Sequence, residues 1–264
     1  MSTTHAHHHE HAAHGGAAAA GGVTSALGGY LLSPIAAPGA VGEAGTLSFR
    51  ILGADGGAVT DFAASHGKRL HLIVVRSDGT HFRHVHPTLA ADGTWSLPWE
   101  WAAAGSYRVY ADAVPTDGTT ATPLTLTRTV DVAGTFAPRP PAATTTATVG
   151  GFDVTLRGEL VAGSSAELIA HVTRDGQPVT SLQPYLGAFG HLVALREGDL
   201  AYLHVHPEGD EPQDGALSGP EVRFLAVAPT PGRYLLYLDF QVDGQVLTAP
   251  FVVDAARARH HHHG

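Results

Sequence analysis

The stretch that decides the fold is KRLHLIVVRSDGTHFRHVHP, residues 68–87. It begins with an apolar run of strand length, turns at Ser77-Asp78-Gly79 and returns to Pro87. Aliphatic and β-branched residues favour strands, Asp-Gly favours a tight turn, and proline ends a strand that needs its N–H for pairing. The stretch therefore predicts an antiparallel β-hairpin.

The same pattern returns 120 positions later as AFGHLVALREGDLAYLHVHP, residues 188–207. Around it, residues 55–62 resemble 175–182, and residues 105–112 resemble 232–239. Self-similarity of this kind indicates repeated structural units. Turn signals recur roughly every eight to twelve residues and no amphipathic helical stripe is present, which is typical of β-sandwich domains.

We therefore predict an all-β chain with two tandem immunoglobulin-like domains, over 28–134 and 150–254. A Pro/Thr-rich linker is expected over 135–149, and disordered His-rich tails over 1–27 and 255–264. Whether the C-terminal histidine run is native or a cloning tag stays open. The tail histidines are His5, His7, His8, His9, His11, His14, His260, His261, His262 and His263.

The composition narrows the ligand types that this chain can offer. Fifteen basic residues against 24 acidic ones, with a formal net charge of −9 and no basic cluster, argue against a nucleic-acid partner or an anionic membrane. There is no cysteine, and Met1 is the only methionine, so thiolate and thioether metal sites are excluded. Nineteen histidines, together with carboxylates, remain as ligands.

No stretch is long and apolar enough for a transmembrane helix, and no charged region precedes an apolar one as in a secretory signal. The sequence as written therefore predicts a cytoplasmic protein and leaves export by another route open.

The histidines of the two hairpins have the spacing of a metal site. His84 and His86 share one face of their strand because side chains alternate. The midpoint between positions 71 and 84 falls inside the turn, so an even loop places His71 directly opposite His84. Three imidazoles at such separations can converge on one ion. We predict the ligands to be His71, His84 and His86 in the first hairpin and His191, His204 and His206 in the second.

Two aspartates extend this prediction. Asp112 and Asp239 occupy matching positions in a late strand of each repeat. Each is expected near the histidine cluster of its own repeat, either as a fourth ligand or as a group that orients a ligand histidine. His66 has only Leu186 as its counterpart, so we place it outside the repeated site.

These residues resemble a bacterial, largely actinobacterial, family of Ig-like heavy-metal-binding proteins, which is loosely similar to copper-resistance domains. The resemblance covers roughly residues 28–254, and its most specific part is the doubled His-x(12)-His-x-His-Pro motif. It implies an Ig-like or cupredoxin-like sandwich that binds copper or another heavy metal.

The favoured function is binding of a divalent metal ion for buffering, delivery or resistance, with a metal transporter or metalloprotein as a candidate partner. Affinity order favours copper(II), with zinc next. One alternative is a metalloenzyme, because Gly198, His204, His206 and Glu211 partly match a cupin motif and a three-histidine site can activate water or dioxygen. The other alternative is a partner-binding Ig-like module whose histidines are incidental.

Overall fold

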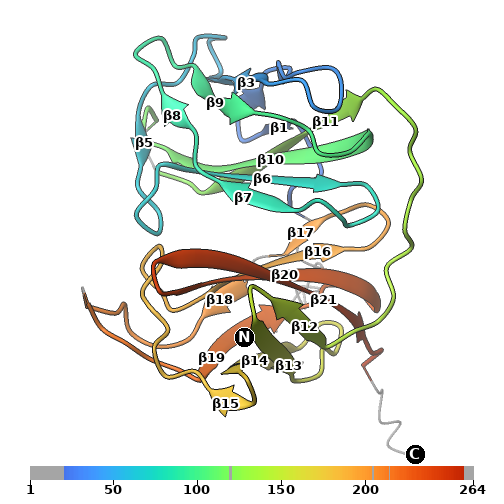
Figure 1. Ribbon diagram of the computed structural model, residues 1–264. Helices are drawn as coiled ribbons and strands as arrows, with labels where there is room; N and C mark the ends of the chain where they lie inside the picture. Colours follow the sequence, from blue (N-terminus) through green and yellow to red (C-terminus); the bar gives the residue numbers. More distant parts are fainter. Residues whose placement is uncertain (1–20, 119–120, 204, 214, 259–264) are drawn as a thin grey trace, which may run out of the picture.

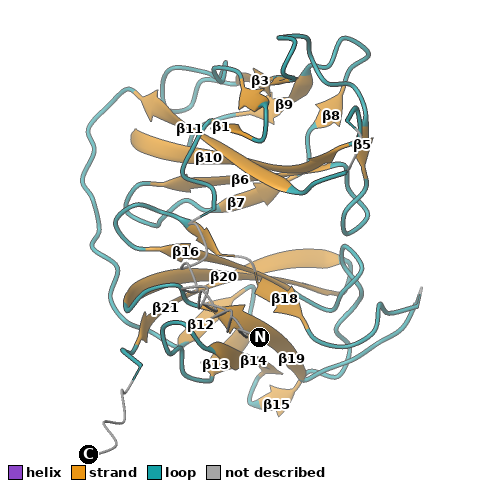
Figure 2. Ribbon diagram, turned by 180° about the vertical axis from the view of Figure 1, so that it is seen from behind, coloured by secondary structure: helices purple, strands orange, loops and turns teal. Residues whose placement is uncertain are grey.

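The computed structural model describes residues 21–118, 121–203, 205–213 and 215–258 and shows two stacked β-sandwiches (Figures 1 and 2). These residues form strands and turns and no helix, so none of them lies in a helix that could span a membrane. The predicted all-β fold with two tandem sandwich domains is confirmed.

Among the described residues, the first domain contains eleven strands in three sheets. They are β1 (Ala26–Leu27), β2 (Tyr30–Leu32), β3 (Gly45–Phe49), β4 (Ile51–Leu52), β5 (Phe62–Ala63), β6 (Leu70–Arg76), β7 (Arg83–Val85), β8 (Thr88–Leu89), β9 (Trp95–Trp99), β10 (Gly105–Pro115) and β11 (Leu124–Val132). The largest sheet has the order β11-β10-β6-β7, with β5 beside β10, and the others are β3-β9-β8 and β1-β2-β4.

The part of the second domain that the structure describes contains ten strands in two sheets. They are β12 (Thr146–Val149), β13 (Phe152–Arg157), β14 (Ser165–Arg174), β15 (Gln177–Pro178), β16 (His191–Arg196), β17 (Tyr202–Leu203), β18 (Val205–Pro207), β19 (Glu221–Val227), β20 (Gly232–Val242) and β21 (Gln245–Ala255). One sheet has the order β17-β16-β20-β21, and the other has β12-β13-β14-β19-β18, with β15 beside β14.

Both domains begin earlier than the sequence predicted. Gly28-Gly29 and Gly150-Gly151 are two-residue hairpin loops, because Leu27 pairs with Tyr30 and Val149 with Phe152. All four glycines have positive φ, as the favoured two-residue hairpin turn requires. The predicted starts at 28 and 150 therefore fall inside hairpins, and the strands before them, β1 and β12, belong to the domains rather than to tail and linker.

Strand β6 is buried on both faces. Leu72 and Val74 pack into the core of their own sandwich. Ile73 and Val75 point the other way, into a separate cluster that includes Val193 and other apolar residues of the second domain. Both faces of β6 are apolar because one covers the domain core and the other the interface between domains.

That interface has approximate twofold symmetry. The Tyr110 hydroxyl donates to the carbonyl of Leu200, and the Tyr237 hydroxyl donates to the carbonyl of Gly79, each at 2.6 Å. The two tyrosines match in the repeats, and their acceptors lie in corresponding hairpin loops. Phe82 also stacks on Tyr237, with ring centroids 4.0 Å apart. The inner sheets of the two sandwiches therefore dock through equivalent surfaces (Figure 1).

Candidate metal centre

The three histidines of the first hairpin share one face, although the predicted register was wrong by two residues. Ile73 pairs with His84 and Leu72 with Val85, so continuing the ladder puts His86, not His84, opposite His71. A shift of two residues preserves the alternation of faces, whereas a shift of one would reverse it. The histidines therefore all face the second domain.

The hairpin turn explains the shift. The Arg76 N–H donates to the carbonyl of Thr80 at 2.9 Å, which closes the turn. The three-residue loop 77–79 adds the first of the two extra positions, and His81, in the left-handed region with φ of 53°, adds the second on the returning strand. Regular pairing resumes only at Val74 and Arg83. A bulge of this kind changes register in a way that spacing alone does not reveal.

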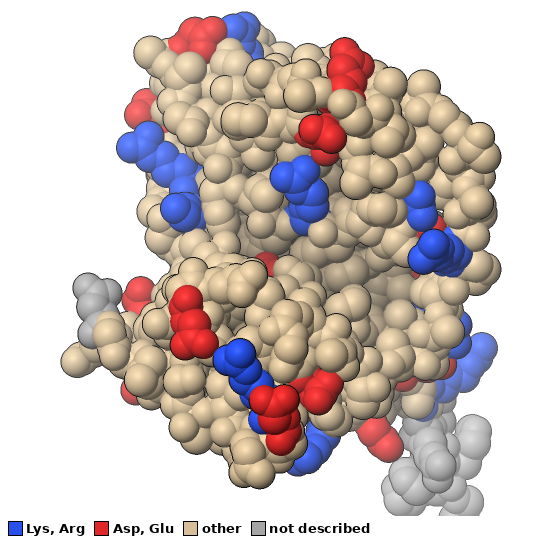
Figure 3. Space-filling view, in the orientation of Figure 1, with Lys and Arg blue, Asp and Glu red and all other residues tan. Residues whose placement is uncertain are grey.

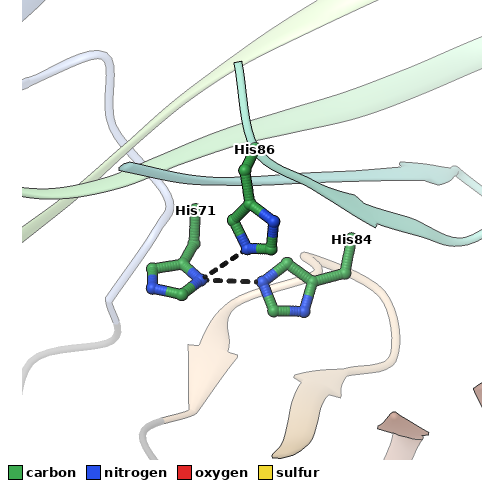
Figure 4. Close-up of side chains that lie close together, drawn as sticks. All are labelled: His71, His84 and His86. Atoms are coloured by element: carbon green, nitrogen blue, oxygen red, sulfur yellow. Dashed lines mark hydrogen bonds between the residues drawn. The ribbon is translucent and has the colours of Figure 1, made fainter. Parts of the chain in front are cut away.

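The imidazole nitrogens converge on one point (Figure 4). His71 Nδ1 lies 2.9 Å from His84 Nε2 and 3.2 Å from His86 Nε2. One nitrogen from each residue lies within 4.8 Å of the other two. A tetrahedral ion bound at 2.0–2.1 Å per nitrogen requires nitrogens about 3.3 Å apart. The cluster therefore already has nearly the spacing of a ligand set.

The outer nitrogens of two of these rings are held by acceptors. His71 Nε2 donates to the carbonyl of Ser65 at 2.9 Å, and His84 Nδ1 donates to Asp239 Oδ2 at 2.7 Å. These acceptors assign the proton of each neutral ring to its outer nitrogen. His71 Nδ1 and His84 Nε2 therefore face each other with lone pairs, an arrangement that a cation between them relieves.

Burial disfavours a proton on two of the three rings at neutral pH. Together with the smaller effect of the neighbouring imidazoles, it lowers the pKa of His71 to about 4 and the pKa of His86 to about 3. Neutral imidazole is the form that ligates metal. His71 and His86 are thus in their ligating form well below pH 7.

Asp239 reaches the first cluster from the second domain. It lies in β20, is 2% exposed, and its Oδ1 accepts from Thr248 Oγ1 at 2.5 Å while Oδ2 accepts from His84. Asp239 is also the cross-strand partner of His191, which is where the sequence placed it, and its contact with His84 of the other domain is an addition that the sequence did not predict. The cause is the docking of the inner sheets, which no pattern within one repeat could show.

Asp112 occupies the matching place in the first domain. It is the cross-strand partner of His71, and its Oδ1 accepts from Thr125 Oγ1 at 3.1 Å. It does not belong to the group of ligand atoms that lie within 4.8 Å of one another. Its role as a fourth ligand stays a prediction.

The second hairpin reproduces part of this geometry. His191 Nε2 donates to the carbonyl of Tyr185 at 2.8 Å, as His71 does to Ser65, and burial lowers the pKa of His191. His206 is exposed and lies in β18, which pairs with β19 of the opposite sheet. His204 lies outside the described residues. A second cluster of His191, His204 and His206 therefore stays a prediction.

His66 is a neighbour that the sequence reasoning missed. It lies in the turn before β6, with φ of 48°, and its ring centroid is 5.3 Å from that of His191 in the other domain. Its counterpart Leu186 has the same left-handed backbone, with φ of 55°, but no imidazole. Comparison of the repeats therefore excluded His66 from the predicted site. His66 contacts a histidine of the other domain and is not part of a motif that both repeats share.

A cavity of about 110 Å³ adjoins the cluster between the two domains. Figure 3 shows a hollow at this level, with charged side chains scattered over the surface around it. Polar residues that line the cavity include His66, His71, His84, Asp112 and His191.

Comparison with known proteins identifies the repeats but no activity. A family model described as "Domain of unknown function (DUF8832)" matches residues 25–131 and again residues 147–257. No curated protein matches the chain. None of these findings links the chain to a metal-binding or copper-resistance family, so the expected resemblance is supported only for the repeated β-sandwich architecture.

Several solved structures are similar at low identity. The adhesin InvE of Yersinia pseudotuberculosis is 11% identical, over 86% of this chain and 58% of that one, with a TM-score of 0.25. Fibronectin(III)-like modules of CbhA from Clostridium thermocellum are 13% identical, over 89% of this chain and 100% of theirs, with a TM-score of 0.24. A Salmonella alpha-2-macroglobulin mutant is 16% identical, over 91% of this chain and 15% of that one, with a TM-score of 0.29. Scores this low carry no argument about function.

Proposed function

We propose that this chain, which belongs to the DUF8832 family through both of its repeats, binds a divalent transition-metal ion at His71, His84 and His86. Imidazole ligands suit copper(II), zinc and several other ions. Affinity order favours copper(II), with zinc next. The biological role would be metal buffering, delivery or resistance.

The observation that supports this proposal best is the direction of the ring nitrogens. Two of the rings direct one nitrogen outward, to acceptors on Ser65 and Asp239, and the other nitrogen inward to the cluster. A carboxylate behind a ligand histidine is a recurring feature of zinc sites, because it fixes the ring and makes the ligand nitrogen more basic. Histidines that served only to satisfy backbone groups would have no reason to converge on one point.

The N-terminal histidines extend the proposal. The Tyr202 N–H donates to the carbonyl of Gly21 at 2.9 Å, and Tyr202 also lines the cavity beside the cluster. His14 lies seven residues before Gly21, and seven residues span at most about 25 Å. We propose that the tail histidines collect ions weakly and release them to the cluster, from which a transporter or metalloprotein takes them.

Calorimetric titration with Cu²⁺ and Zn²⁺ tests the proposal. The chain is trimmed to residues 21–258, which retains every described strand and removes the tail histidines. His84→Ala should lower the affinity at least about a hundredfold, because it removes one of three ligands. His81→Asn is the matched control: it removes an exposed histidine of the same hairpin and keeps a residue that tolerates positive φ. Absence of binding, or equal affinity in the two variants, would leave the partner-binding module as the better explanation.

The second repeat is tested in the same experiment. If His191, His204 and His206 form a site, the trimmed chain binds about two ions, one for each three-ligand set. His206→Ala should then reduce the stoichiometry to about one. A stoichiometry of one in the parent protein would assign metal binding to the first repeat alone.

The cavity beside the cluster favours a metalloenzyme as the second candidate. Three protein ligands leave a coordination position open, and the adjoining space of about 110 Å³ admits a water molecule or a small substrate. Turnover of a substrate by the metal-loaded protein, lost in His84→Ala, would favour this function.

A further inference from the structure

We infer that metal binding at the first cluster and docking of the two domains are thermodynamically coupled, with Asp239 as the positioning residue that links them. The inference rests on the proposed function, because it concerns the same three histidines. It adds that the first repeat does not form the complete site by itself.

The hydrogen bond from His84 to Asp239 links the cluster to the second domain. Their side chains are 5% and 3% exposed, and the donor and acceptor atoms are 2.7 Å apart. His84 belongs to the first domain and Asp239 to the second, so undocking would expose both groups to water. His84 would then be free to rotate and to change tautomer, and its Nε2 would no longer be fixed toward His71.

Asp239 is itself held in place within its own domain. Thr248, on the neighbouring strand β21, donates to Oδ1, so the carboxylate presents Oδ2 across the interface. A buried carboxylate in this arrangement strengthens the ligand that it orients. The stabilisation of the bound ion therefore depends on the second domain being docked.

Much of the interface lies away from the cluster. Tyr237 and Tyr110 bond to loops of the opposite domain, and Leu195 and Val75 belong to the apolar cluster between the sheets. Linkage is reciprocal: if docking raises metal affinity by some factor, the metal favours docking by the same factor. An ion at the cluster should thus suppress opening of parts of the interface that it does not touch.

The experiment uses the full, uncut chain and Zn²⁺ as the probe. Zinc affinity is measured by competition with a chelator, and opening of the interface by hydrogen–deuterium exchange of residues 193–203. This segment lies in the second domain and contains none of the three histidines. Zinc should slow its exchange about tenfold, within the range typical of coupled sites.

The variants separate the inference from the proposed function. Asp239→Asn should weaken zinc binding about 10- to 100-fold and remove the zinc effect on exchange. Thr248→Val should weaken zinc binding in the same way but by a smaller factor, because it removes the hydrogen bond that holds Asp239. If Asp239→Asn does not fold, this variant tests the role of Asp239 in its place. Asp243→Asn is the matched control, because it removes an exposed carboxylate at a turn of the same domain. If zinc still slows the exchange of residues 193–203 in His84→Ala, the slowing comes from zinc bound at other histidines, and the inference is overturned.

Two further outcomes are decisive. If the parent protein binds no zinc, the proposed function fails. If it binds zinc through His84 but exchange of residues 193–203 is unchanged, or Asp239→Asn binds as tightly as the parent, the proposed function stands and only the coupling is overturned.

Discussion

A buried histidine whose lone pair faces two other imidazoles is costly to protonate, and His71 shows the consequence for stability. Its pKa in the folded protein is about 4, against about 6.5 in an unfolded chain. Between these values the unfolded state binds more protons than the folded state. The contribution of His71 to stability is therefore complete above pH 6.5 and lost as the pH falls toward 4.

This predicts an acid-sensitive metal-free protein. Lowering the pH from 7 to 4 should cost about 3 kcal/mol of unfolding free energy through His71 alone. Urea denaturation in the presence of a chelator, at several pH values, measures the loss. In His71→Gln the dependence between pH 6.5 and 4 should be shallower by about that amount. Parallel pH profiles for the two proteins would contradict the assignment.

At the scale of the element, the Gly-Gly loops fix where each domain begins. Gly150 and Gly151 both have positive φ, but a Cβ on Gly150 would lie 2.8 Å from the Leu247 side chain, whereas a Cβ on Gly151 would meet nothing within 4 Å. An L-residue with positive φ costs about 1 kcal/mol.

We therefore expect Gly151→Ala to lower the unfolding free energy by about 1 kcal/mol. Gly150→Ala should cost more, because it adds a steric contact with Leu247 to the same backbone strain. Chemical denaturation of the two variants tests this order. The opposite order would mean that the turn rearranges.

The hairpins also show how far the sequence could predict the site. Spacing and alternation placed His71, His84 and His86 on one face, and this prediction is confirmed. The register itself could not be derived, because the three-residue loop and the left-handed residue His81 each add one position, which spacing does not encode. The fold class and the doubling of the domain followed from the repeat, which is a property of the whole chain.

Contacts between the repeats could not be predicted from the sequence. Asp239 was placed beside His191 of its own repeat, which is its cross-strand partner, but its contact with His84 was not predicted, because self-comparison finds equivalence and not proximity between repeats. One signal was available: β6 is apolar on both faces, and a strand of that kind is expected to be covered on both. His66, which has no equivalent in the second repeat, gave no signal.

At the scale of the whole molecule, the two tyrosine hydroxyls should contribute comparably to domain docking. Tyr110→Phe and Tyr237→Phe each leave a carbonyl of the opposite domain without its donor. Loss of a buried hydrogen bond that leaves one partner unsatisfied costs about 1–3 kcal/mol. Denaturant titration of both variants should show losses of similar size, and a large loss in only one would contradict the twofold character of the interface.

The symmetric docking of the two domains has a consequence at low protein concentration. Two separate subunits that met through such equivalent surfaces would form a dimer, and the dimer would dissociate on dilution. Here a connector joins the halves, so they meet at an effective concentration set by its length, in the millimolar range for short flexible connectors. A site shared between the halves therefore stays assembled at any protein concentration. That property would suit the proposed binding of trace ions.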